Sequence, residues 1–128
     1  MFNLIYRDGA PENTGHYEVF EKTDGSGSAL AVGQLVSVAN GIASKYTVGK
    51  PYGVVAISAA DGEDSVAVLR ITDDMIFSAS LTGEASIGGA LKHTDSGVST
   101  ATTSGYGFEV TEIVSEKLVK GRFVNLDA

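Results

Sequence analysis

The apolar positions of this chain recur in short alternating runs, and the runs fall into two similar halves. The strand candidates are residues 29–38, 42–48, 51–59 and 65–71 in the first half, and 87–93, 98–103, 106–114 and 118–126 in the second. Val, Ile and Thr suit a pleated strand, and glycine and polar residues suit the turns between strands. The pattern predicts an all-β protein made of many short strands.

Individual positions of the two halves match each other. The matches are Leu35 with Leu91 and Gly41 with Gly97 at a spacing of 56, Tyr52-Gly53 with Tyr106-Gly107 at 54, and Arg70 with Arg122 at 52. The spacing between matched positions falls in steps of two residues, as expected if surface loops differ in length between the two halves. Two copies are too few for a solenoid, which needs about three. We therefore expect one β domain over 29–128, a compact barrel or sandwich whose two similar β-units span 29–71 and 85–126.

Two segments lie outside the repeat. Residues 1–28, with short strand candidates at 2–6 and 16–20 and a polar link at 23–28, have the composition of an N-terminal arm or an edge segment. Residues 72–83 join the two units. There Asp73 suits the cap of a short helix over 74–80, and Met75-Ile76-Phe77 suits a strand equally well. At most one short helix is expected in the whole chain.

Composition and charge exclude several classes of function. The chain has no cysteine, which excludes disulfides and thiolate sites. Its net charge of −7 and its nine scattered Lys and Arg residues oppose binding to nucleic acid or to an anionic membrane. Residues 25–44 carry no charge, but their glycine, serine and asparagine residues favour a buried hairpin over a membrane span. No signal-peptide pattern opens the sequence.

Phosphate and calcium loops fail at specific positions. Residues 44–51 contain a Gly-Lys step but do not match the P-loop motif. Ser44 stands in place of the first glycine of the motif, and Pro51 stands in place of the Ser or Thr that would bind Mg²⁺. The acidic run 61–64 does not begin an EF-hand calcium loop. A loop that starts at Asp61 would need Gly at position 66 and Glu at position 72, where the chain has Val66 and Thr72. This run and Asp73-Asp74 are interpreted as solvated turns.

No catalytic, cofactor-binding or metal-binding residue is assigned, and the chain is predicted not to be an enzyme. The two histidines, His16 and His93, lie far apart, with no motif that would orient either of them. A hydrolase that uses His93 with Asp95 is motivated by residue types alone. Three glutamates, at 109, 112 and 116, fall on the last predicted hairpin. Side chains at 109 and 112 point to opposite faces of a regular strand, so we interpret them as charges that deter aggregation.

Tyr52 and Tyr106 hold equivalent places in the two units, each before a glycine. Such aromatic residues can serve as stacking platforms for carbohydrate. The favoured interpretation is a ring packed at the rim of the core with its hydroxyl group in water.

The arrangement resembles the small, Gly- and Val-rich β proteins that decorate tailed-phage capsids, known as cement or head-decoration proteins. The residues that carry the likeness are 33–36, 53–55, 85–91, 95–100 and 106–110. The resemblance implies a structural protein of the virion exterior, assembled in the host cytoplasm. It implies that the protein binds the major capsid protein of an assembled shell, commonly as a trimer, and does no chemistry. The alternative is a ligand- or glycan-binding β module of a surface fibre or adhesin.

Overall fold

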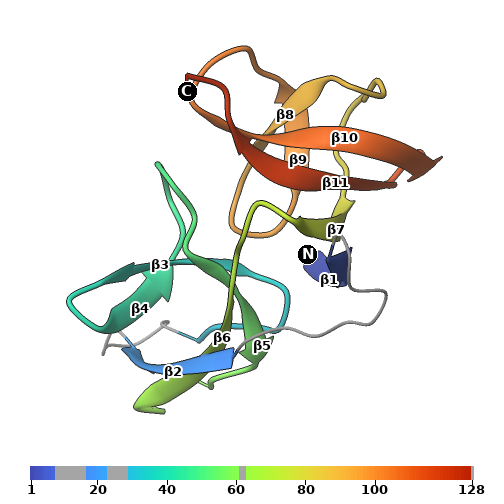
Figure 1. Cartoon of the computed structure of the whole chain (residues 1–128). Coiled ribbons are helices and arrows are strands. Elements are labelled where there is room, and N and C mark those ends of the chain that lie inside the picture. The colour runs from blue at the N-terminus through green and yellow to red at the C-terminus, as the bar shows by residue number, and fades with distance from the viewer. Residues whose placement is uncertain (8–16, 23–28, 61–62, 128) are drawn as a thin grey trace.

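A computed structural model of the chain describes residues 1–7, 17–60 without 23–28, and 63–127. These residues form two β-sheets and contain no helix, which confirms the all-β prediction (Figure 1). The strands are β1 (Phe2–Arg7), β2 (Tyr17–Lys22), β3 (Leu35–Ala39), β4 (Ile42–Lys45), β5 (Gly53–Ile57), β6 (Ser65–Arg70), β7 (Met75–Ser80), β8 (Ala90–His93), β9 (Val98–Ala101), β10 (Tyr106–Ser115) and β11 (Leu118–Asn125).

The first sheet is a closed barrel of five strands in the order β2-β4-β3-β5-β6. β2 closes it by pairing antiparallel with β6 and parallel with β4. The interior is filled by small and branched aliphatic side chains: Leu30, Val36, Ala43, Val55, Ala59, Val66 and Val68. The described part of the N-terminal segment thus supplies a wall of this barrel through β2 and an edge strand of the other sheet through β1.

The second sheet has six strands in the order β1-β7-β11-β10-β8-β9. β7 pairs antiparallel with β11 as β2 does with β6, and a parallel bridge from Leu81 to Val98 brings the end of β7 to β9. In the first unit β2 likewise pairs parallel with β4. The strands β2 to β6 and β7 to β11 therefore follow the same order, and the fold contains two similar β-units.

The register of the strands locates equivalent residues. Leu35 lies across from Val54 in the first unit, and Leu91 lies across from Phe108 in the second. The expected match of Arg70 with Arg122 is wrong. Arg70 lies across from Gly53, whereas Val124 lies across from the equivalent Gly107. The spacing between the units therefore remains 54 through the last strand.

The two units share one core, to which both contribute equivalent positions. Leu35, Val54 and Leu69 of the barrel pack in the same cluster as Leu91 and Phe108 of the second sheet. The cluster also holds Phe2, Tyr46, Met75, Phe77, Ala79, Leu81, Val98, Val110 and Val119. The backbone N–H of Leu35 donates to the carbonyl of Asp95 at 2.8 Å, which ties the units together.

Local signals predicted some boundaries and missed others. The Asn40-Gly41 turn is confirmed, because both residues have positive φ and connect β3 to β4 as a type I′ turn does. The helix considered over 74–80 is wrong, since Met75–Ser80 is the strand β7. Five of its six residues are buried, so packing on both faces removes the alternation that marks a strand. In the same way Val68 faces the barrel interior while Leu69 faces the shared core.

Candidate functional site

His93 is partly buried at the junction of the two units. Its ring lies 5.1 Å from the ring of Tyr46 and 5.5 Å from that of Phe123, between centroids. Among the described residues neither ring nitrogen has a hydrogen-bond partner outside His93 itself, and burial lowers the pKa of His93 to about 4. The side chain lines a cavity of about 250 Å³ together with Lys50 and Asp73. A neutral, packed imidazole is the result.

The His93–Asp95 pair considered for a hydrolase is not formed. Asp95 accepts a hydrogen bond from Nε2 of Gln34 at 3.3 Å, and no interaction joins it to His93. His16 lies outside the described residues. Among the residues the structure describes, no three His, Asp or Glu side chains gather as metal ligands would.

The acidic turns make local contacts. Asp61 lies outside the described residues, and Oε1 of Glu63 accepts from the backbone N–H of Ala60 at 3.1 Å. Asp74 accepts a hydrogen bond from the hydroxyl of Thr72. These contacts are typical of carboxylates that stabilise a turn.

The equivalent tyrosines have different surroundings. Tyr52 is in edge-to-face contact with Phe20, its hydroxyl donates to Glu18 at 2.7 Å, and the guanidinium of Arg70 lies 5.5 Å from its ring centroid. Burial and the bond to Glu18 raise the pKa of Tyr52. Arg70 therefore covers the ring that a sugar would stack on. Tyr106 is partly exposed beside the His93 cavity.

The expectation that Glu109 and Glu112 point to opposite faces is wrong. Thr111 is an extra residue in β10, because Val110 and Glu112 lie across from the adjacent residues Gly121 and Lys120. This β-bulge shifts the alternation by one, so both glutamates lie on the outer face. Glu109 pairs with Arg122 at 3.7 Å and Glu112 with Lys120 at 3.8 Å.

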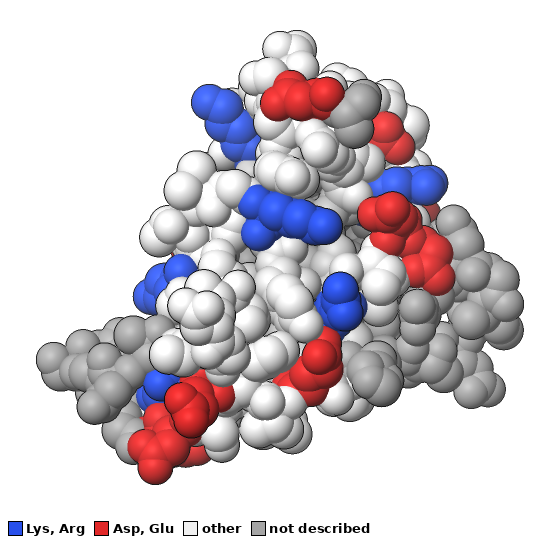
Figure 2. Space-filling view, turned by 60° about the vertical axis from the view of Figure 1, so that its left-hand side comes forward, with Lys and Arg blue, Asp and Glu red and all other residues white. Residues whose placement is uncertain are grey.

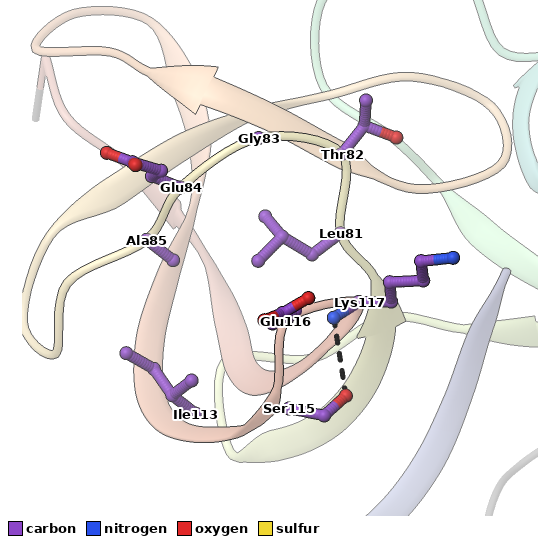
Figure 3. Close-up of a pocket in the computed structure, with 9 residues that line it drawn as sticks. All are labelled: Leu81, Thr82, Gly83, Glu84, Ala85, Ile113, Ser115, Glu116 and Lys117. Atoms are coloured by element: carbon purple, nitrogen blue, oxygen red, sulfur yellow. Dashed lines mark hydrogen bonds between the residues drawn. The ribbon is translucent and has the colours of Figure 1, made fainter.

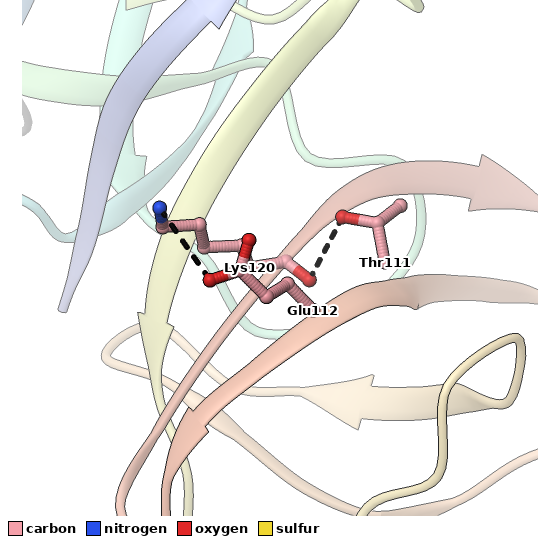
Figure 4. Close-up of polar contacts among 3 residues, drawn as sticks. All are labelled: Thr111, Glu112 and Lys120. Carbon is pink, nitrogen blue, oxygen red and sulfur yellow. Dashed lines mark hydrogen bonds and ion pairs between the residues drawn. The ribbon is translucent and has the colours of Figure 1, made fainter.

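The threonine of the bulge also binds the neighbouring strand. Its Oγ1 donates to the carbonyl of Lys120 at 3.2 Å (Figure 4). The Glu109–Arg122 and Glu112–Lys120 ion pairs also join β10 to β11, on the outer face of this hairpin. Glu109 lies where β10 is paired on both sides, so it does not guard an edge, whereas Glu112 lies beyond the last residue that β8 pairs with.

Charge of both signs is spread over one face of the molecule. On the face shown in Figure 2, basic and acidic side chains are interspersed among uncharged ones and form no continuous basic area. The Gly-Lys step at 49–50 lies in the loop after β4, where the hydroxyl of Tyr46 donates to the carbonyl of Gly49 at 2.8 Å. We therefore interpret neither the mixed charge of this face nor the Gly-Lys loop as a phosphate-binding site.

Exposed aliphatic side chains gather on the outside of the barrel. Val19 of β2 lies across from Ala67 of β6, which lies across from Ile57 of β5. Val19 is 72% exposed and Ile57 67% exposed, and Tyr17 is exposed next to them. We call Tyr17, Val19, Ile57 and Ala67 the outer apolar face. It continues the side of the barrel that buries Leu69 in the shared core.

A second exposed feature is a groove beside the tip of the β10–β11 hairpin. Its volume is about 870 Å³, and its lining residues are Leu81, Thr82, Gly83, Glu84, Ala85, Ile113, Ser115, Glu116 and Lys117. Figure 3 shows Leu81 pointing into the space between the 82–85 loop and the hairpin tip. We call this feature the hairpin groove. Sequence reasoning missed both surfaces, because Val19, Ile57 and Ile113 carry no signal that distinguishes them from core residues.

Comparison with known proteins adds no assignment. No protein-family model matches the chain, and no curated protein matches it significantly. Among the described residues no helix is long and apolar enough to cross a membrane. The surfaces are therefore interpreted from their own chemistry.

Proposed function

We propose that this chain is a structural protein of the virion that binds the outer surface of an assembled phage capsid and stabilises it. The observation that carries the proposal is the outer apolar face. Aliphatic side chains in register on three neighbouring strands, as Val19, Ala67 and Ile57 are, form a contiguous surface of the kind that protein partners cover. The proposed partner is the major capsid protein.

Two further features support this function. The two units share a core and a backbone hydrogen bond, so the molecule transmits force as one body between the subunits it contacts. The net charge of −7 keeps an exposed protein from capturing loose DNA. The resemblance to decoration proteins adds a trimer to the proposal, which a mass measurement by light scattering tests directly.

Sedimentation with capsids tests the proposal. The purified protein at micromolar concentration is incubated with expanded empty capsids of its phage and the capsids are pelleted. We expect the protein in the pellet, and a protein that stays in the supernatant refutes the function. Replacing Val19 and Ile57 by lysine should abolish binding. The matched control is Val48→Lys in the loop between β4 and β5, where the side chain is also exposed, and it should bind normally.

A further inference from the structure

Strand β10 extends beyond the strand that pairs with it. β8 pairs with Phe108 and Glu109 only, and the last backbone contacts on that side join Val110 to Gly88 and Gly89 at 2.8 and 2.9 Å. From Thr111 to Ser115 no strand in the described part of the chain pairs with this side of β10. Thr111 and Val114 are extra residues relative to β11, so this stretch spans less than the about 17 Å of five regular strand residues. An open edge of this length accepts an added strand.

The hairpin groove lies along this open edge and has an apolar floor. Ile113 lies across from Val119, so both side chains are on the core side of the hairpin. Val119 is fully buried, whereas Ile113 is 42% exposed. The residues that pack over Val119 therefore do not extend over the whole of Ile113. Leu81 and Ala85 form the opposite wall. The volume of about 870 Å³ falls in the range of sites that bury a ligand.

The charges at the groove favour a basic occupant. Glu84 and Glu116 line it, and neither has an ion-pair partner among the described residues. Lys117 is the one lysine or arginine among the described residues of the lining, so carboxylates outnumber basic side chains there. The backbone N–H of Leu81 donates to the carbonyl of Lys117 at 2.9 Å, which holds the 82–85 loop against the hairpin tip.

We propose that the hairpin groove binds an extended segment of a partner protein in which basic residues lie two positions before and after an aliphatic residue, so that all three side chains are on one face. The segment adds a strand to the open edge of β10 at Thr111–Ser115. One aliphatic side chain inserts between Ile113 and Leu81, and the basic side chains meet Glu84 and Glu116. This inference rests on the proposed function in one respect, that the segment belongs to the major capsid protein.

Peptide titration of the full chain tests the groove without capsids. The probe is a capped hexapeptide with valine at position 3, lysine at positions 1 and 5 and serine elsewhere, and the control peptide carries glutamate in place of lysine. With ¹⁵N-labelled protein and millimolar peptide, we expect amide shifts confined to 81–85 and 111–117, with slowed exchange at 111–115, for the lysine peptide alone. Shifts elsewhere, equal shifts with both peptides, or no shifts overturn the inference.

Two variants on the same strand sharpen the test. Ile113→Ser should weaken peptide binding about tenfold or more, equivalent to about 1.4 kcal/mol. Val114→Ser replaces a similarly exposed side chain that does not line the groove, and it should bind as the wild type does. If the groove signals instead move with protein concentration alone, a second copy of the chain occupies the groove and the inference is overturned.

Capsid sedimentation separates this inference from the proposed function. Wild-type protein that pellets while Ile113→Ser stays in the supernatant supports both. If Ile113→Ser and the double reversal of Glu84 and Glu116 to lysine pellet as well as the wild type does, the function stands and the groove inference fails. If the wild type does not pellet, the proposed function fails, and the peptide titration still decides whether the groove binds extended segments.

Discussion

Leu35 of β3 and Leu91 of β8 hold the same position in the two β-units, and both are buried in the core that the units share. Each lies across from an equivalent residue of the next hairpin, Val54 or Phe108. The units therefore face each other through corresponding sides. Each unit alone would therefore expose to water the face that it buries in the shared core, in addition to whatever interior it has of its own.

The shared core predicts that the whole chain unfolds in one step. Leu35→Ala and Leu91→Ala should each lower the free energy of unfolding by about 2–5 kcal/mol, because each leaves a cavity in the same cluster. Both variants should keep a single thermal transition in which the calorimetric and van't Hoff enthalpies agree. Differential scanning calorimetry measures this, and a second transition in either variant would show that the units are independent.

His93 predicts a pH dependence of stability with a definite sign. Its pKa in the folded protein is lowered from 6.5 to about 4, so the folded state favours the neutral ring. As the pH falls from about 6.5 to about 4, the unfolded chain takes up this proton before the folded chain does, and stability is lost. The loss is on the order of 3 kcal/mol and does not grow further below that window.

Denaturant unfolding of the wild type and of His93→Gln at a series of pH values isolates this effect, since the carboxylates titrate in both proteins. The difference in the free energy of unfolding between the two should be constant above pH 7. On acidification the variant should gain free energy of unfolding relative to the wild type, by up to about 3 kcal/mol. A difference that stays constant down to pH 4 would contradict the prediction.

Gly121 should tolerate no side chain. A Cβ atom there would lie 2.1 Å from the carbonyl oxygen of Glu109 and 2.7 Å from Cε2 of Phe108. Gly121→Ala must therefore displace β10 or Phe108, and we expect a loss of about 3 kcal/mol or more. Gly41→Ala is the control, because Gly41 has open space but a φ of 78°, which costs about 1 kcal/mol. Urea unfolding of both variants measures the ranking, and equal losses would refute the steric argument.

Local chemistry was enough to predict much of the fold. The Asn40-Gly41 turn, the pairing of hairpins and the equivalence of Leu35 with Leu91 follow from turn residues and repeated spacing. The wall formed by β2 could not be predicted, because the sequence of Tyr17–Lys22 does not match that of its structural counterpart β7 and its role depends on pairing with distant β6. The strand β7 was ambiguous because burial on both faces hides its period.

The candidate surfaces were beyond sequence reasoning for a different reason. Val19 and Ile57 have the residue types of a core, and only the closure of the barrel places them outside. The bulge at Thr111 was equally hidden, because threonine is a common strand residue and nothing in the sequence marks it as the extra one. That one insertion decides the face on which Glu112 lies.

Deleting single residues of β10 tests the bulge directly. Without Thr111, Val110 and Glu112 become consecutive and still lie across from Gly121 and Lys120, so the register of β10 with β11 is already the regular one. We expect this deletion to fold, to keep the Glu112–Lys120 contact and to lose only the local twist and the hydrogen bond of Thr111. That cost is about 1 kcal/mol. The deletion of Glu109 is the control, because it moves the buried Phe108 or Val110 to the outer face and should abolish folding. Circular dichroism melting and amide NMR spectra compare the two, and a deletion of Thr111 that unfolds the chain as the control does would show that the bulge is required for the fold.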